Sequence, residues 1–112
     1  MATYYGNSNP PKKNQAWAVQ IALQDMANPG SYKASPTIAS GDFKTSGASN
    51  GGSPSAMGNL TVLPSVDPSG SIWVNLQLSA SEMNFDQVFV QCIDQTNPAE
   101  WAALAFCIET TA

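Results

Sequence analysis

Short stretches of the chain alternate apolar and polar residues, which is the period of two that a half-buried β-strand requires. The clearest stretch runs from residue 71 to 78. Three further stretches, 16–25, 88–93 and 102–110, alternate in the same way. The residues that these four predicted strands would bury are Val19, Ile21, Leu23, Ile72, Val74, Leu76, Leu78, Val88, Val90, Leu104, Phe106 and Ile108.

Weaker patterns lie between the predicted strands 16–25 and 71–78. The stretch 37–45 predicts a short strand, and residues 60–63 predict an edge strand before Pro64. Residues 46–59 are mostly Ser, Gly, Ala, Asn and Pro, a composition typical of a loop. For residues 98–104 two alternatives remain, a turn that leads into the last strand or a short helix with Pro98 in its first position.

The segment between the strands 71–78 and 88–93 has the spacing of a capping box. Ser79 is followed three residues later by Glu82, which favours a single helical turn from Ser79 to Asn84. Such a turn suits a chain that crosses from one sheet of a sandwich to the other. Several short strands with Gly and Pro turns therefore predict an all-β, antiparallel β-sandwich domain over residues 16–112. Residues 1–15 are polar and predict an extended N-terminal arm.

The composition narrows the classes of partner. The 112 residues include 4 Lys and Arg against 8 Asp and Glu, a net charge of −4, which argues against a nucleic-acid groove. The charged fraction is 11%, below the roughly 25% typical of soluble domains. A surface with so few charges is typical of subunits that pack against other proteins.

The same composition argues against several kinds of catalysis and ligand binding. The chain has no His and no Arg, so the commonest general base and the bidentate phosphate ligand are missing. The Asp and Glu residues lie in predicted turns or at strand ends, where carboxylates are normally solvated. Asp86 and Asp94 stand eight residues apart, which does not fit a calcium loop. We therefore expect no catalytic residue, no cofactor, no metal ion and no small-molecule substrate, and a protein that is not an enzyme.

We expect the protein to be made in the cytosol, since no run approaches the ~18 apolar residues of a membrane span and residues 1–7 do not resemble a secretion signal. Cysteines in that compartment are usually reduced. Cys92 shares a predicted face with Val88 and Val90, whereas Cys107 points the other way from Phe106. The sequence thus predicts two free thiols.

Five aromatic residues are candidates for contacts with other proteins, because buried aromatic side chains carry much of the energy of an interface. Trp73 and Phe89 alternate away from the predicted core. Trp101, in a predicted turn, either caps one end of the sandwich or meets a partner. Tyr4 and Tyr5 lie in the arm, which we expect to become ordered on a neighbouring subunit.

The order of motifs from about residue 25 to 110 resembles the small Ig-like β-sandwich proteins encoded among the virion structural genes of tailed bacteriophages. The resembling segments are Lys33-Ala34-Ser35-Pro36-Thr37, Gly41-Asp42-Phe43-Lys44, Gly51-Gly52, Asn59-Leu60, Leu63-Pro64, Pro68-x-Gly70 and Leu78-Ser79-Ala80-Ser81-Glu82-Met83-Asn84. The last segment is the most specific. The chain departs from the family at residues 46–59, where a tight Asp-Gly-Gly hairpin is usual.

The resemblance implies an Ig-like sandwich and a non-enzymatic virion protein made in the host cytoplasm, with no catalytic residues to carry over. Its partners would be other virion proteins, such as the major capsid or tail subunits, and further copies of itself. Capsid decoration or cement is the first interpretation. A tail-associated or fibre-anchoring module is the second. A carbohydrate-binding receptor module is the third, and it requires Trp73, Phe89 and Trp101 to be coplanar and exposed.

Overall fold

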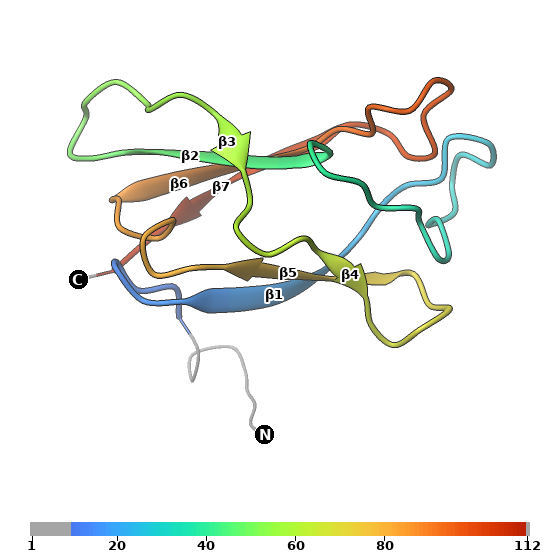
Figure 1. The fold of residues 1–112 in the computed structure, drawn as a ribbon, viewed down its shortest axis with the longest axis horizontal. Coiled ribbons are helices and arrows are strands. Elements are labelled where there is room, and N and C mark those ends of the chain that lie inside the picture. Colours follow the sequence, from blue (N-terminus) through green and yellow to red (C-terminus); the bar gives the residue numbers. More distant parts are fainter. Residues whose placement is uncertain (1–9, 112) are drawn as a thin grey trace.

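The chain forms two antiparallel β-sheets that lie face to face, as the computed structural model shows for residues 10–111 (Figure 1). One sheet has three strands in the order β1-β5-β4, and the other has four in the order β3-β2-β6-β7. The strands are β1 (Trp17–Ala22), β2 (Phe43–Ala48), β3 (Gly58–Asn59), β4 (Ser65–Val66), β5 (Trp73–Leu78), β6 (Gln87–Cys92) and β7 (Leu104–Glu109). The prediction of an all-β antiparallel sandwich is confirmed.

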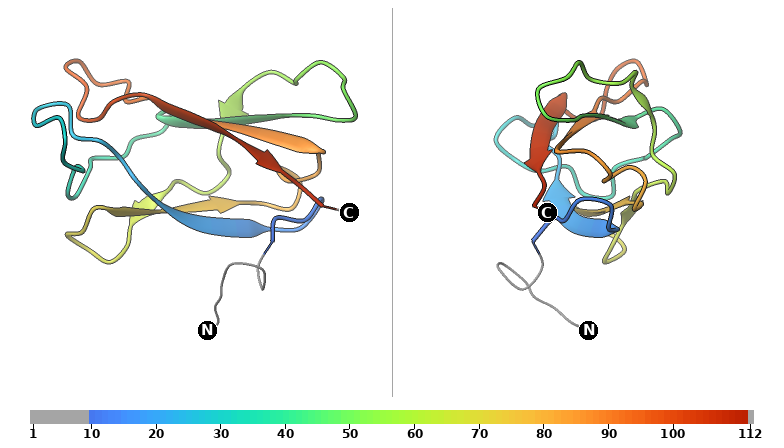
Figure 2. Two further views of the ribbon diagram at one scale, coloured as in Figure 1. Left: turned by 180° about the vertical axis from the view of Figure 1, so that it is seen from behind. Right: turned by 90° about the vertical axis from the view of Figure 1, so that its left-hand side faces the viewer.

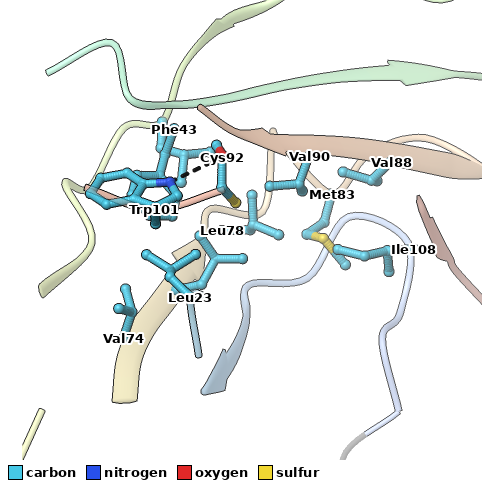
Figure 3. Packing of buried hydrophobic residues seen from close by; sticks show 12 residues of the cluster. Leu23, Phe43, Val74, Leu78, Met83, Val88, Val90, Cys92, Trp101 and Ile108 are labelled. Atoms are coloured by element: carbon cyan, nitrogen blue, oxygen red, sulfur yellow. Dashed lines mark hydrogen bonds between the residues drawn. The ribbon is translucent and has the colours of Figure 1, made fainter. Parts of the chain in front are cut away.

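The core fills the space between the two sheets, because each strand turns alternate side chains inward. In β5 the inner residues Val74, Leu76 and Leu78 are all buried, as the alternation predicts. The buried cluster consists of Leu23, Phe43, Leu60, Val74, Leu76, Leu78, Met83, Val88, Val90, Cys92, Trp101 and Ile108 (Figure 3). Val19, Ile21, Leu104 and Phe106 pack against it as half-buried side chains. The expectation for Ile72 was wrong, since it precedes β5, is only half-buried and is not part of this core.

The region between β1 and β5 differs most from the prediction. β2 begins at Phe43 rather than residue 37 and continues through Ser46–Ala48, which were expected to be loop. The expected strand at residues 60–63 does not form, and short pairings at Gly58–Asn59 and Ser65–Val66 flank it instead. Small residues suit β2 because Phe85 packs over Gly47 and leaves no room for a side chain there.

The predicted helical turn at Ser79 forms as a single turn between β5 and β6. The amide of Met83 donates to the carbonyl oxygen of Ser79 over 3.0 Å, which is an α-type hydrogen bond. The amide of Ser79 donates to Glu82 Oε1 over 2.7 Å, and the amide of Glu82 donates to Ser79 Oγ over 3.2 Å. These reciprocal bonds are those of a capping box. Glu82 also accepts from the amide of Thr61, so the corner holds the segment before β4.

The segments that precede and follow β7 are both hydrogen-bonded to residues near the start of the domain. Residues 98–103 form no helix, and the residues around Trp101 pair with the extension of β1, since the amide of Ala102 donates to the carbonyl of Gln24. At the other end, the amide of Lys13 donates to the carbonyl of Thr111 and the amide of Asn14 to that of Met83. Residues 11–14, which the sequence assigns to the arm, are therefore part of the packed structure.

Candidate protein-contact surfaces

The strands of the three-stranded sheet carry no charged side chain on their outer face. Residues that pair directly across an antiparallel ladder point to the same side of the sheet, and Ala22 pairs with Trp73, Gln20 with Asn75 and Ala18 with Gln77. Ser65 of β4 pairs with Asn75 and extends the same row. The seven side chains on this face are Ala18, Gln20, Ala22, Ser65, Trp73, Asn75 and Gln77, and all are uncharged. We call this surface the contact face.

Trp73 is the largest side chain on the contact face, and 44% of its surface is exposed. Its cross-strand partner is Ala22, whose methyl group is too short to cover the indole. The backbone of Trp73 is held on both sides. Its amide donates to Ser71 Oγ over 3.1 Å, and its carbonyl accepts from the amide of Asp67 over 3.0 Å. A large aromatic ring on a fixed backbone can enter an interface at a small cost in conformational entropy.

Exposed Val62 lies at the opposite end of the contact face, and exposed Leu63 follows it in the chain. Val62 is 43% exposed and Leu63 is 53% exposed, and both belong to the segment that leads into β4. Val62 lines a hollow of about 410 Å³ together with Ala18 and Gln77. The contact face therefore has an apolar residue at each end and polar, uncharged amides in the middle. Sequence reasoning placed residues 60–63 in a strand and so missed this end of the surface.

Phe89 lies on the other side of the molecule. It is on the outer face of the four-stranded sheet, where it pairs with Ser46 of β2 and Cys107 of β7, and it is half-buried. This second face carries charge, because Lys44 and Glu109 share it. Trp73 and Phe89 face away from one another on opposite sheets, so a single partner surface cannot cover both. Trp73 and Phe89 therefore do not form the coplanar aromatic set that a carbohydrate-binding module requires.

Trp101 is a core residue, and its assignment as a contact residue was wrong. Only 1% of its surface is exposed. Its indole Nε1 donates to the carbonyl oxygen of Cys92 over 3.2 Å, and its ring packs at 6.0 Å from that of Phe43 (Figure 3). The residue is buried because its backbone pairs with Asp25, seventy-six positions away along the chain. A turn composition at residues 96–100 does not reveal such a pairing.

Two of the carboxylates that were expected to be solvated are buried and hold loops. Asp42 accepts from the amides of Ala39 over 2.8 Å and Gln95 over 3.0 Å. Asp94 accepts from the amides of Thr96 over 2.9 Å and Glu100 over 2.7 Å. Burial of Asp94 opposes its charge, but these hydrogen bonds outweigh that effect and lower its pKa. Both carboxylates are engaged by backbone amides, which is a structural role.

Lys13 and Asp86 form an ion pair of 3.2 Å that joins residue 13 to the start of β6. This contact and the hydrogen bond from the amide of Asn50 lower the pKa of Asp86. Both side chains of the pair are well exposed, so its contribution to stability is small. Within residues 10–111, no group of three or more metal-ligating side chains comes together.

Tyr4 and Tyr5, the remaining candidate contact residues, lie outside the described residues, and their contact with a neighbouring subunit stays a prediction. Cys92 is buried, Cys107 is exposed and both are free, as expected. No helix among the described residues has the length and apolar character needed to span a membrane. Comparison of the chain with family models, curated proteins and solved structures finds no match.

Proposed function

We propose that this chain is a non-enzymatic structural subunit of a tailed-bacteriophage virion that binds the assembled capsid as a decoration or cement protein. The observation that carries the proposal is the contact face, whose strand residues are uncharged, with exposed Trp73 at one end and exposed Val62 at the other. Depletion of charge together with exposed aromatic side chains is the composition that distinguishes the centre of a protein interface.

Two features of the fold support the resemblance on which this assignment rests. The strand order β3-β2-β6-β7 opposite β1-β5-β4 fits the finer assignment of an Ig-like sandwich. The most specific resembling segment, Leu78–Asn84, forms the corner between the sheets and closes its capping box through Ser79 and Glu82.

The size of the contact face suggests how it would be used. Two strands of six residues and the two-residue β4, about 4.8 Å apart with about 3.4 Å per residue, give a face of roughly 200–250 Å². A standard interface buries about 800 Å² from each partner. The contact face alone would therefore bind weakly, and firm attachment would need the hollow beside Val62, a second contact or many copies acting together on a repetitive shell. A subunit that is made in the host cytoplasm and then binds the virion in many copies meets that condition.

The test places a charge on either side of the sandwich. Gln77→Glu puts a carboxylate on the contact face, and Gln91→Glu puts the same charge on the outer face of the four-stranded sheet. Each purified variant is added to virus particles that lack the protein, and the bound copies per particle are counted. We expect Gln77→Glu to reduce occupancy at least tenfold while Gln91→Glu binds like the wild type. Equal occupancy for the two variants contradicts the assignment of the contact face.

The position of bound copies separates the capsid role from its closest alternative. Gold-labelled protein spread over the shell supports capsid decoration. Label confined to the tail would replace that role with a tail-associated or fibre-anchoring module, which could use the same contact face.

A further inference from the structure

The loop between β2 and β3 begins with a tight turn at residues 49–52, and Figure 2 shows this loop at one end of the four-stranded sheet. The amide of Gly52 donates to the carbonyl oxygen of Ser49 over 2.8 Å, which closes the turn. Its two central residues, Asn50 and Gly51, have φ angles of 48° and 79°. Positive φ at both central positions is the geometry of a type I′ turn, for which Asn-Gly is the preferred sequence. The turn therefore holds an Asn-Gly pair at the surface.

An asparagine that is followed by glycine can react with its own backbone. The amide nitrogen of the glycine attacks the side-chain Cγ and forms a cyclic succinimide. The C–N bond of the side-chain amide breaks, and the proton of the attacking nitrogen leaves with the amino group as ammonia. Water then adds to either carbonyl of the ring and opens it to aspartate or isoaspartate, with a carboxylate in place of the amide. Glycine favours the reaction because it has no Cβ to obstruct the attack.

The two reacting groups of this pair are accessible. Asn50 and Gly51 are both exposed. Within residues 10–111, the side-chain amide of Asn50 and the backbone amide of Gly51 make no hydrogen bond. A Cβ at Gly51 would meet open space, so no other segment crowds this residue on that side. The attacking nitrogen and water can therefore both reach the Asn50 side chain.

The other asparagines that the structure describes lack this combination, since Asn50-Gly51 is the only Asn-Gly pair in the sequence. Some precede proline, whose nitrogen carries no proton to lose and cannot close the ring. The others precede a residue with a large side chain, which obstructs the attack. Asparagines before proline are Asn28 and Asn97, and those before a larger residue are Asn14, Asn59, Asn75 and Asn84.

The turn itself restrains the reaction. Ring closure rotates the peptide between Asn50 and Gly51 toward the side chain, so the hydrogen bond across the turn has to open first. The amide of Asn50 donates to Asp86 Oδ2, which fixes the backbone on one side of the turn. Asp86 is itself held, because it directly precedes β6 and pairs with Lys13 over 3.2 Å. The rate of the reaction therefore follows the local opening of the turn, which Asp86 opposes.

We propose that Asn50 is a site of spontaneous modification, at which succinimide formation with Gly51 replaces the amide by a carboxylate, and that Asp86 slows this reaction by holding the turn closed. The new negative charge lies next to Asp86, and the two like charges repel. Isoaspartate also adds a carbon atom to the main chain inside the turn, so the hydrogen bond across it cannot re-form in its original geometry. The modification thus loosens the loop 49–57 from the start of β6. The inference concerns the isolated protein and does not depend on the proposed virion role.

Timed incubation of the protein at pH 8 tests the site. Samples are digested at acidic pH, and chromatography with mass spectrometry gives the converted fraction of each asparagine. The internal control is Asn59, which is also exposed but precedes Leu60. We expect Asn50 to react at least tenfold faster than Asn59 and to yield both isoaspartate and aspartate. Equal rates at the two residues would overturn the assignment of the site, and aspartate without isoaspartate would overturn the cyclic mechanism.

Removal of the restraint tests the role of Asp86. Asp86→Ala removes the acceptor of the Asn50 amide and should accelerate the conversion of Asn50 severalfold. The matched control is Glu109→Ala, which removes a carboxylate that bonds to Gln87 and not to the turn, and it should leave the rate unchanged. Equal acceleration in both variants, or none in Asp86→Ala, would overturn the role of Asp86. A parallel acceleration at Asn59 in Asp86→Ala would show that the whole fold opens rather than the turn, which would also overturn that role.

Discussion

The ring of Phe85 lies directly over the backbone of Gly47, so that a Cβ atom at Gly47 would overlap the Phe85 ring and its Cβ. Phe85 directly follows the corner that contains the capping box, and Gly47 belongs to β2 of the four-stranded sheet. This close approach fixes where the corner meets the sheet. It also explains why β2 contains a residue of low strand propensity at a buried position.

Gly47→Ala should therefore destabilise the protein although alanine favours strands more than glycine does. The added methyl group must displace the Phe85 ring or the strand, and such overpacking costs about 1–3 kcal/mol. Urea unfolding measures the loss. Gly58→Ala is the matched control, because a Cβ there meets open space and the residue also lies in a strand. Equal losses in the two variants would contradict the role assigned to Phe85.

The strands with strict alternation were predictable from the sequence, and those with small residues were not. β1, β5, β6 and β7 carry large apolar residues at every second position, so burial of one face follows from the pattern. In β2 the segment Ser46–Ala48 has no large side chain and is buried by what other segments place on it. Because this composition is typical of loops, the sequence did not predict the second half of this strand.

The capping box makes a second prediction about stability. Glu82→Ala removes the acceptor for the amides of Ser79 and Thr61, so the corner loses its reciprocal bonds and the segment before β4 loses its anchor. Loss of a cap costs about 0.5–2 kcal/mol. Chemical denaturation should show that loss. Glu109→Ala, which removes an exposed carboxylate bonded to Gln87, should change stability by less than about 0.5 kcal/mol. A loss of stability in Glu109→Ala as large as that in Glu82→Ala would contradict the role assigned to the capping box.

Removal of the side chain should destabilise the protein far more at Trp101 than at Trp73. Trp101→Ala leaves a cavity in the core and removes the hydrogen bond to the Cys92 carbonyl, and it should cost about 3–5 kcal/mol. Trp73→Ala removes an exposed ring and should change the free energy of unfolding by less than about 0.5 kcal/mol. Denaturant unfolding of both variants checks the prediction. Equal destabilisation would show that Trp73 supports the fold and is not available to a partner.

The candidate contact residues show where sequence reasoning about a site reaches its limit. Trp73 was predictable as an outward residue because its strand alternates strictly. Its separation from Phe89 was not, since an alternating pattern gives the face of each strand but not the sheet to which the strand belongs. The exposure of Val62 and Leu63 depends on an irregular segment between two short pairings, and no period in the sequence marks it.

Acid should weaken the fold partly through Asp94. A carboxyl whose pKa is lower in the folded protein than in the unfolded chain contributes stability above the unfolded value, about 3.9, and loses it as the pH falls through the folded value. The pKa of Asp94 is lowered in this way. The free energy of unfolding should therefore fall below about pH 4, and in Asp94→Asn it should be lower at pH 7 and fall less steeply. Unfolding curves from pH 7 to pH 2 measure both slopes, and identical slopes would contradict the assignment to Asp94.

The two thiols should differ in their reaction with iodoacetamide, which attacks the thiolate. Burial raises the pKa of Cys92 to about 12 and keeps reagent away, so this residue should react only when the protein opens. Cys107 is exposed and should react first. Mass spectrometry of timed samples in the absence of reductant distinguishes the two sites, and labelling of Cys92 as fast as Cys107 would contradict its burial.

The reactivity of Cys107 should in turn depend on its neighbour Glu109. Partial burial raises the pKa of Cys107, and the negative charge of Glu109, which also accepts its S–H hydrogen bond, raises it further. Glu109→Gln removes that charge, so a larger fraction of Cys107 is thiolate at pH 8 and alkylation should be severalfold faster. Asp67→Asn makes the same change of charge on the other sheet and should leave the rate unchanged. An equal acceleration in both variants would mean that net charge, rather than the contact between Glu109 and Cys107, controls the thiol.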